Sequence, residues 1–180
     1  MGTTYHIQPI APVEENTVRV PAGVVTFGLE MRDLNPAIIH GFYGGRPDEE
    51  RVTELTSGQE GPVDDGGPSI HVFGSEDELE YLRFDCFRQG PHYHYIHPRE
   101  TFQVVNEMDP VAFGDVFQWA VGRLRSRLPE MLIEAGGAEL AAGIDPALVA
   151  AALDRMTELA RTRTSVASVP SVPSVPQVGT

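Results

Sequence analysis

The sequence has 180 residues, of which 41% are hydrophobic and 22% charged, and this composition is typical of one globular domain rather than of a disordered chain. Its 13 basic residues are outnumbered by 26 acidic residues, and the resulting net charge of −13 repels nucleic-acid phosphates and anionic lipid surfaces. We therefore expect neither a nucleic acid nor a membrane as a partner.

The single cysteine, Cys86, excludes an intrachain disulfide and excludes zinc or iron–sulfur sites built from several thiolates. No apolar run approaches the roughly 20 residues that a membrane-spanning helix needs. The first residues also lack the basic start and the apolar block of a secretory signal. These features predict a soluble, cytoplasmic protein.

The first two thirds of the chain have the pattern of a sheet. Stretches rich in β-branched and aromatic residues predict strands at 18–20, 23–31, 69–74, 79–88 and 92–97. Residues 40–68 are dense in glycine, proline and acidic residues and are predicted to be a long loop. Because short turns at 75–78 and 89–90 separate the last three strands, these strands are predicted to form an antiparallel meander.

The next part of the chain is predicted to be helical. Asp-Pro pairs at 109–110 and 145–146 are typical helix starts, with the aspartate as N-cap and the proline at the first helical position. The first helix is predicted to be interrupted or restarted at Pro129, and the last to run to about Arg161. Strands followed by helices predict an α+β fold, in which two to three C-terminal helices pack on one face of an antiparallel sheet.

The end of the sequence repeats Ser-Val-Pro and has neither charge nor apolar periodicity. Residues 165–180 are predicted to be a disordered tail, which can also serve as a docking peptide. Residues 1–164 are predicted to form a single α+β domain.

The two faces of the meander follow from the turn at 89–90. If this turn has two residues, Asp85 lies opposite His94 and Arg83 lies opposite Ile96. The polar face then carries Arg83, Asp85, His92 and His94, and the face toward the helices carries Leu82, Phe84, Cys86, Tyr93 and Tyr95. A slip of one residue would exchange the histidines with the tyrosines, so this prediction depends on the turn.

His92 and His94 are predicted to form a metal site together with Asp85. Alternate residues of a strand lie about 7 Å apart at Cα on the same face, so two imidazoles can bind one divalent ion and a carboxylate can be the third ligand. His97 joins them only if the strand ends or bulges at Ile96. The candidate ions are Zn, Fe, Cu and Mn.

The same residues are also candidates for catalysis without a metal ion. A histidine braced by a carboxylate is a general base near neutral pH, which makes His94 and Asp85 catalytic candidates, with Tyr81 as a donor or acceptor on the same surface. Arg83 and Arg46 are candidates for binding the acidic group of a small-molecule substrate. No glycine-rich phosphate-binding pattern is present, so no nucleotide cofactor is expected.

Two further histidines have open roles. Because side chains alternate between the two faces of a strand, His71 is predicted on the face toward the helices. His40 lies in the glycine-rich stretch, from which it can reach over the sheet.

The strand at 92–97 also has a structural interpretation, since cross-strand histidine–aspartate pairs are common in ordinary sheets. Two functions therefore remain open. The first is a metal-dependent enzyme acting on an acidic small molecule. The second is a non-catalytic binding or assembly module, including a homodimer, that uses the aromatic-histidine strand as its surface.

Overall fold

The computed structural model describes residues 2–43 and 65–167, and within these ranges the strands form one seven-stranded sheet. The strands are β1 (Thr3–Tyr5), β2 (Thr17–Ala22), β3 (Val25–Leu34), β4 (Asp65–Gly74), β5 (Glu80–Asp85), β6 (His92–His97) and β7 (Phe102–Glu107). Neighbouring strands are antiparallel in the order β1-β7-β6-β5-β4-β3-β2, so β2 to β7 form a meander and β1 adds beside β7. The predicted antiparallel sheet is confirmed.

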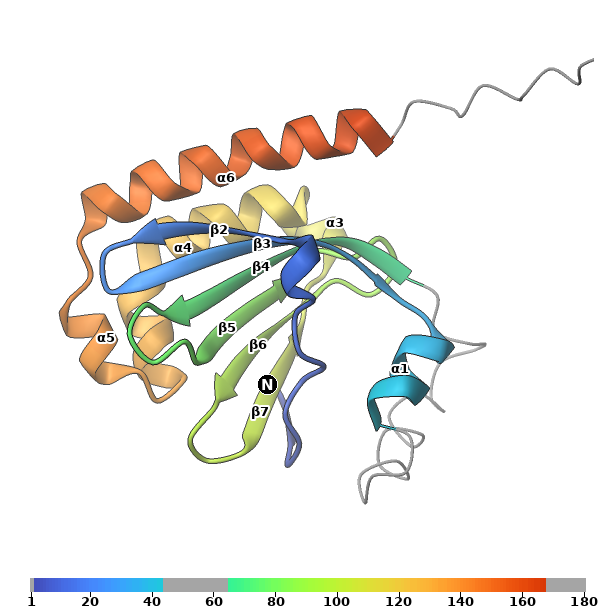
Figure 1. Cartoon of the computed structure of the whole chain (residues 1–180), viewed down its shortest axis with the longest axis horizontal. Coiled ribbons are helices and arrows are strands. Elements are labelled where there is room, and N and C mark those ends of the chain that lie inside the picture. Colours follow the sequence, from blue (N-terminus) through green and yellow to red (C-terminus); the bar gives the residue numbers. More distant parts are fainter. Residues whose placement is uncertain (1, 44–64, 168–180) are drawn as a thin grey trace, which may run out of the picture.

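The long C-terminal helices cover one face of this sheet. The helical segments are η1 (Glu14–Asn16), α1 (Pro36–Tyr43), α3 (Pro110–Phe113), α4 (Val116–Glu134), α5 (Ala138–Ala142) and α6 (Pro146–Ala167). α6 packs against β2 and β3, and α4 packs against β5 (Figure 1). Side chains such as Phe27, Phe84, Leu124 and Leu153 are completely buried in the core between sheet and helices. The predicted α+β class is therefore confirmed.

The predicted helix starts are also confirmed, with one difference. The carboxylates of Asp109 and Asp145 each accept hydrogen bonds from the backbone N–H groups two and three residues further on. Gly114, at a φ of 69°, ends α3 after about one turn, and α4 begins anew with Asp115 as its N-cap. Glycine adopts such a positive φ without strain, and the chain turns away from the helical conformation here, which divides the predicted first helix in two.

Pro129 does not interrupt α4, contrary to the prediction. Leu128 and Leu132, on either side of it, have at most 1% of their surface exposed. Burial of these side chains stabilises the helix by more than the hydrogen bond that proline cannot donate.

α6 is longer than predicted. It continues past Arg161 to Ala167 and thus enters the segment predicted as a tail. The rest of that predicted tail, residues 168–180, lies outside the described residues. In the described ranges, no helix combines the length and the apolar content that crossing a membrane requires.

β1, α1 and β7 have patterns too weak to be predicted from the sequence. β1 has only three residues, and its pairing with β7 joins segments about a hundred positions apart, such as Thr3 with Val105. α1 begins after Asn35, whose side chain accepts a hydrogen bond from the backbone N–H of Ile38.

β4 begins at Asp65, four residues before the predicted strand, because it pairs with the end of the long strand β3.

The predicted two-residue turn at 89–90 is wrong, although the faces it implied are correct. β5 ends at Asp85 and β6 begins at His92, so residues 86–91 connect them. In the observed register Asp85 pairs with His92, two residues away from the predicted partner His94. A shift of two residues changes partners without changing faces, since the pleat has a period of two.

A bulge in β5 changes the face of the residues before it. Val72 pairs with Leu82 and Phe73 pairs with Glu80, which leaves Tyr81 as an extra residue. Glu80 therefore shares the polar face with Arg83, to which it is hydrogen-bonded. Tyr81 instead packs into the core beneath the helices.

Candidate metal centre

The face of the sheet opposite α4 and α6 is roofed by the N-terminal segment. In Figure 1 this segment, drawn in dark blue, crosses in front of the sheet between β1 and η1. Together with sheet residues it lines an open cavity of about 230 Å³. The cavity lining includes Ile7 and Ile10 from the roof, Ile39 from α1, and Arg32, Asp85, His92, His94 and Gln103 from the sheet. The cavity thus combines an apolar roof with a polar floor.

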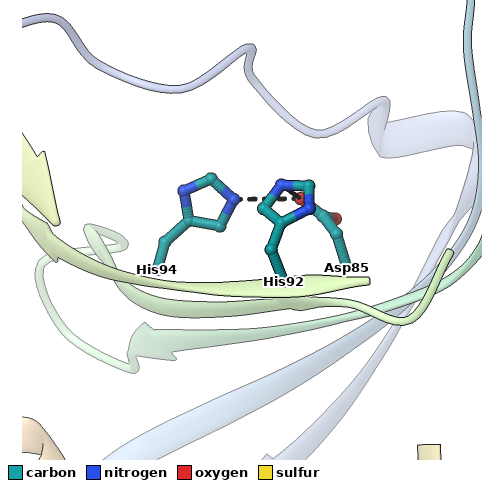
Figure 2. A group of neighbouring side chains, drawn as sticks. All are labelled: Asp85, His92 and His94. Atoms are coloured by element: carbon teal, nitrogen blue, oxygen red, sulfur yellow. Dashed lines mark hydrogen bonds and ion pairs between the residues drawn. The ribbon is translucent and has the colours of Figure 1, made fainter. Parts of the chain in front are cut away.

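Three potential metal ligands meet on this floor. His92 and His94 lie one pleat apart on β6, and Asp85 projects beside them from β5 (Figure 2). The Oδ2 atom of Asp85 is 3.1 Å from Nε2 of His94 and 3.4 Å from Nε2 of His92, and the three ligand atoms lie within 4.8 Å of one another. An ion about 2.1 Å from two ligand atoms holds them about 3.0–3.4 Å apart at tetrahedral or octahedral angles. These three side chains form a group that could hold a metal ion.

The hydrogen bond of His92 fixes which of its nitrogens is available. Its Nδ1 atom lies 2.7 Å from the carbonyl oxygen of Gly90. Because a carbonyl oxygen only accepts, neutral His92 carries its proton on Nδ1, and the lone pair on Nε2 then faces the carboxylate of Asp85. A lone pair and a carboxylate oxygen repel each other unless a cation lies between them. The arrangement therefore suits a bound metal ion or a second proton.

The other two ligands are oriented in the same way. The hydroxyl of Ser69 donates to Oδ1 of Asp85 at 2.5 Å, which leaves Oδ2 to face the histidines. Nδ1 of His94 lies 2.7 Å from Oε1 of Gln103, which leaves Nε2 to face Asp85. Metal-binding histidines commonly donate their second N–H to a neighbouring acceptor, because this holds the ring and makes the other nitrogen a better ligand.

Burial and hydrogen bonding shift the pKa values of two of these groups downward. Burial lowers the pKa of His94 and outweighs the hydrogen bond that its protonated form would donate from Nε2 to Asp85, so its neutral, metal-binding form is favoured. Burial alone would raise the pKa of Asp85, but the hydrogen bond with His94 and the charge of His92 hold it well below its usual range. Asp85 is thus ionised and His94 neutral near pH 7, the forms that bind a metal.

A buried ion network lies beside this group on the same face. Glu80 accepts two hydrogen bonds from Arg83, from Nε at 2.8 Å and from Nη2 at 2.5 Å. His71 lies between two carboxylates, with Nδ1 2.6 Å from Oε1 of Glu80 and Nε2 3.2 Å from Oε2 of Glu30. His71 is completely buried. The prediction that it faces the helices is wrong. The bulge in β5 adds one residue, so His71 pairs with Arg83 and lies on the polar face.

The charges in this network compensate one another. Burial would raise the pKa of Glu80, but the charges of Arg83 and His71 lower it to about 2. Burial would lower the pKa of His71, but the charge of Glu80, the nearby carboxylate of Glu30 and the hydrogen bond with Glu80 raise it. Glu80 is thus ionised at neutral pH and the protonated form of His71 is favoured, although both side chains are buried.

His71 and His94 are therefore expected to titrate in opposite directions from the ordinary histidine pKa of about 6.5. In metal-free protein, His71 stays protonated above this pH and His94 is already neutral below it. The raised pKa means that His71 contributes its full stabilisation below the unfolded value and loses it as the pH rises through the folded value. Imidazole NMR signals recorded across this range measure both titrations, and a lower pKa for His71 than for His94 would contradict the assignment.

His97 is not brought into the cluster. β6 is regular from His92 to His97, so the strand neither ends nor bulges at Ile96, as a ligand role required. The imidazole of His97 stacks on Phe102 with ring centroids 4.0 Å apart and lies near Gly136, at the end of α4. It therefore projects from the face that carries Tyr93 and Tyr95.

Tyr81 likewise lies away from the predicted catalytic group. Its hydroxyl donates to Asp77 at 2.8 Å, and its ring contacts Gly137 beneath the helices. The bulge in β5 places it there, whereas simple alternation predicted it beside Arg83.

The remaining predicted residues have mixed outcomes. Arg83 shares the face of the cluster and lines the cavity, but its donors already bind Glu80 and the carbonyl oxygen of Ile10. His40 lies on α1 and is not among the three grouped ligands. Arg46 lies outside the described residues.

Tyr93 and Tyr95 face away from the metal ligands, as predicted. With Trp119 and other residues of α4 they line a groove of about 500 Å³. An interaction surface on this strand, including a homodimer contact, stays a prediction. Cys86 is buried and free, in agreement with the core position predicted for it.

The roles of Gln103, Ser69 and Arg32 were missed by sequence reasoning. The segment 102–107 contains a phenylalanine and two valines, a strand signal too weak to predict β7 or to place Gln103 beside β6. Ser69 and Arg32 reach the site only through the pairing of β3, β4 and β5, which no local pattern reveals.

The chain was compared with known proteins by sequence and structure. No curated protein and no solved structure matches it. One family model matches residues 19–160, a segment that contains Asp85, His92 and His94 but not the N-terminal roof. Since this match covers well over half of the sequence, the chain belongs to the family described as "Domain of unknown function (DUF7700)".

Proposed function

We propose that this protein is a small metal-dependent enzyme that binds one divalent ion through Asp85, His92 and His94 and acts on an acidic small molecule in the adjoining cavity. One observation carries the proposal. In each of these side chains the other polar atom is held by a protein group, so that Oδ2 and the two Nε2 atoms are left to converge. Such preorganisation is what metal ligands require, whereas ordinary cross-strand pairs do not need it.

Two imidazoles and one carboxylate are a ligand set with open coordination positions. Zinc enzymes and non-haem iron enzymes both use such sets, with water or substrate in the remaining positions. A bound ion would polarise a substrate oxygen or lower the pKa of a bound water. The chain's own residues would hold the ligands in place, while the apolar roof limits access of water.

The acidic group of the substrate is assigned to Arg32. Arg32 lines the cavity with 7% of its surface exposed, and its buried Nη1 atom lies 3.7 Å from Oε2 of Glu30, an ion pair without a hydrogen bond among the described residues. A buried donor without a hydrogen bond is uncommon and is typically matched by a ligand or a water. The sequence predicted Arg83 for this role, but its Nε and Nη2 atoms already donate hydrogen bonds to Glu80. Arg46 stays a prediction.

The size of the cavity limits the substrate. Its volume of about 230 Å³ lies below the usual range for drug-sized ligands, which is about 300–1,000 Å³. The apolar side chains of Ile7 and Ile10 in the roof and of Ile39 on α1 favour a substrate with a short hydrocarbon part. A small carboxylic acid fits these constraints.

Metal titration of the full chain tests the proposal. Protein purified without a histidine tag and stripped with a chelator is titrated with Zn, Fe(II), Mn and Cu in separate experiments. One equivalent of at least one ion is expected to bind and to raise the melting temperature, since an ion that binds only the folded state stabilises it. The metal-loaded protein is then screened for turnover of small carboxylic acids, and Arg32→Met is expected to raise the KM.

Two results would contradict this assignment. If none of the four ions binds at micromolar concentration, the metal site is refuted. If an ion binds but no carboxylic acid perturbs the loaded protein, the enzymatic part is refuted.

A further inference from the structure

The connection between β5 and β6 is wrapped around one buried carboxylate. Oδ1 of Asp65 accepts hydrogen bonds from the backbone N–H groups of Gly66, at 2.8 Å, and Arg88, at 3.1 Å. Oδ2 accepts from the N–H groups of Gln89, at 3.0 Å, and Gly90, at 2.8 Å. Asp65 is 8% exposed. Although burial opposes ionisation, these four bonds lower the pKa of Asp65, so it is a carboxylate at neutral pH.

This arrangement fixes a peptide group that contacts the candidate metal centre. Gly90 donates its N–H to Asp65 and accepts the hydrogen bond of His92 Nδ1 on its own carbonyl oxygen, at 2.7 Å. The following carbonyl, that of Pro91, accepts from the backbone N–H of Met108 at 2.9 Å. Hydrogen bonds therefore hold the backbone on both sides of the Gly90 carbonyl. Glycine has wide conformational freedom, so without these contacts its carbonyl would adopt many directions.

We propose that Asp65 is a positioning residue of the metal centre: it orders residues 88–90 so that the Gly90 carbonyl selects the Nδ1–H form of His92 and turns Nε2 toward Asp85. This inference rests on the metal site proposed above. It adds Asp65, which lies on β4, the strand next to β5. Asp65 contacts neither metal nor substrate in this role. The simpler alternative is that Asp65 only stabilises the β5–β6 connection.

The variant Asp65→Asn separates these roles. Asparagine has nearly the same shape, but its amide nitrogen cannot accept a hydrogen bond, so two of the four N–H groups lose their acceptor. Metal affinity is expected to fall about tenfold, the lower end of the loss when an outer hydrogen-bond partner of a ligand is removed, since the Gly90 carbonyl is displaced but not removed. The 15N signals of His92 in the metal-free protein at about pH 8, well above the ordinary histidine pKa, are expected to change from one tautomer to a mixture of two.

A matched control is Asp145→Ala, which removes an N-cap acceptor. Asp145 also accepts two backbone N–H groups, at the start of α6, on the opposite side of the sheet. This variant is expected to lose stability without any change in metal affinity or in the His92 tautomer. If Asp65→Asn fails to fold, Asp65→Glu replaces it, since glutamate keeps the charge but displaces the carboxylate from the four N–H groups.

The readouts distinguish failure of this inference from failure of the metal site. If the wild type binds no metal, the proposed function fails, and the His92 tautomer alone then decides the role of Asp65. If the tautomer and the metal affinity of both Asp65 variants equal those of the wild type, the positioning role is overturned. A loss of stability equal to that of Asp145→Ala with both signals unchanged also overturns it and leaves the purely structural role.

Discussion

Replacing Arg83 with methionine is expected to destabilise the folded state by about 3–5 kcal/mol, because it leaves buried carboxylates without their main counter-charge. Arg83 is 2% exposed and binds Glu80 through two hydrogen bonds. Glu80 would keep only His71 as a charged partner, and His71 is shared with Glu30. Methionine fills part of the volume but offers no donor.

The measurement is urea denaturation of metal-free protein at neutral pH. Arg125→Met is the matched control, because Arg125 pairs with Asp154 at 2.6 Å on the surface, where 42% and 72% of the two side chains are exposed. Exposed pairs contribute about 0–1 kcal/mol, so this variant should unfold nearly like the wild type. A loss below about 1 kcal/mol for Arg83→Met would contradict the network described here.

Replacing His94 with alanine is expected to weaken metal binding by at least about 100-fold, because even an outer partner of a ligand contributes about 10–100-fold. His94 supplies one of only three grouped ligand atoms in the described ranges, and it is the more buried of the two histidines. The increase in melting temperature on adding metal should be lost with it.

Competition with a chromogenic chelator measures this affinity. His97→Ala is the control, since His97 lies on the same strand but on the opposite face of the sheet. Equal losses in the two variants would indicate nonspecific binding to exposed imidazoles and would refute the site.

The residues on the polar face of the meander could be predicted because the face of a strand residue depends only on whether its position is odd or even. The turn between β5 and β6 was predicted four residues too short, yet Asp85, His92 and His94 remained on one face. An error of an even number of residues exchanges cross-strand partners and leaves the faces intact. The helix starts at 109 and 145 were predictable for a related reason, since capping uses only neighbouring residues.

What could not be predicted depends on contacts between distant segments. The bulge at Tyr81 arises from the pairing of β4 with β5, and it exchanged the expected places of Tyr81 and Glu80 and misplaced His71. The roof over the site comes from an N-terminal segment without periodic pattern. The groups that orient the ligands, Ser69 and Gln103, come from strands on either side of the β5–β6 pair.

The roof also has a consequence for the order in which the molecule assembles. It is anchored where Thr3 pairs with Val105 and where the carbonyl of Ile10 accepts from Arg32 and Arg83, contacts that join residues far apart in sequence. Hairpins and helices form from nearby residues, whereas closing such a long loop costs more chain entropy. We therefore expect the roof to close last during folding and to open first by local unfolding. An ion or ligand would then reach the floor of the cavity while the core of sheet and helices stays intact.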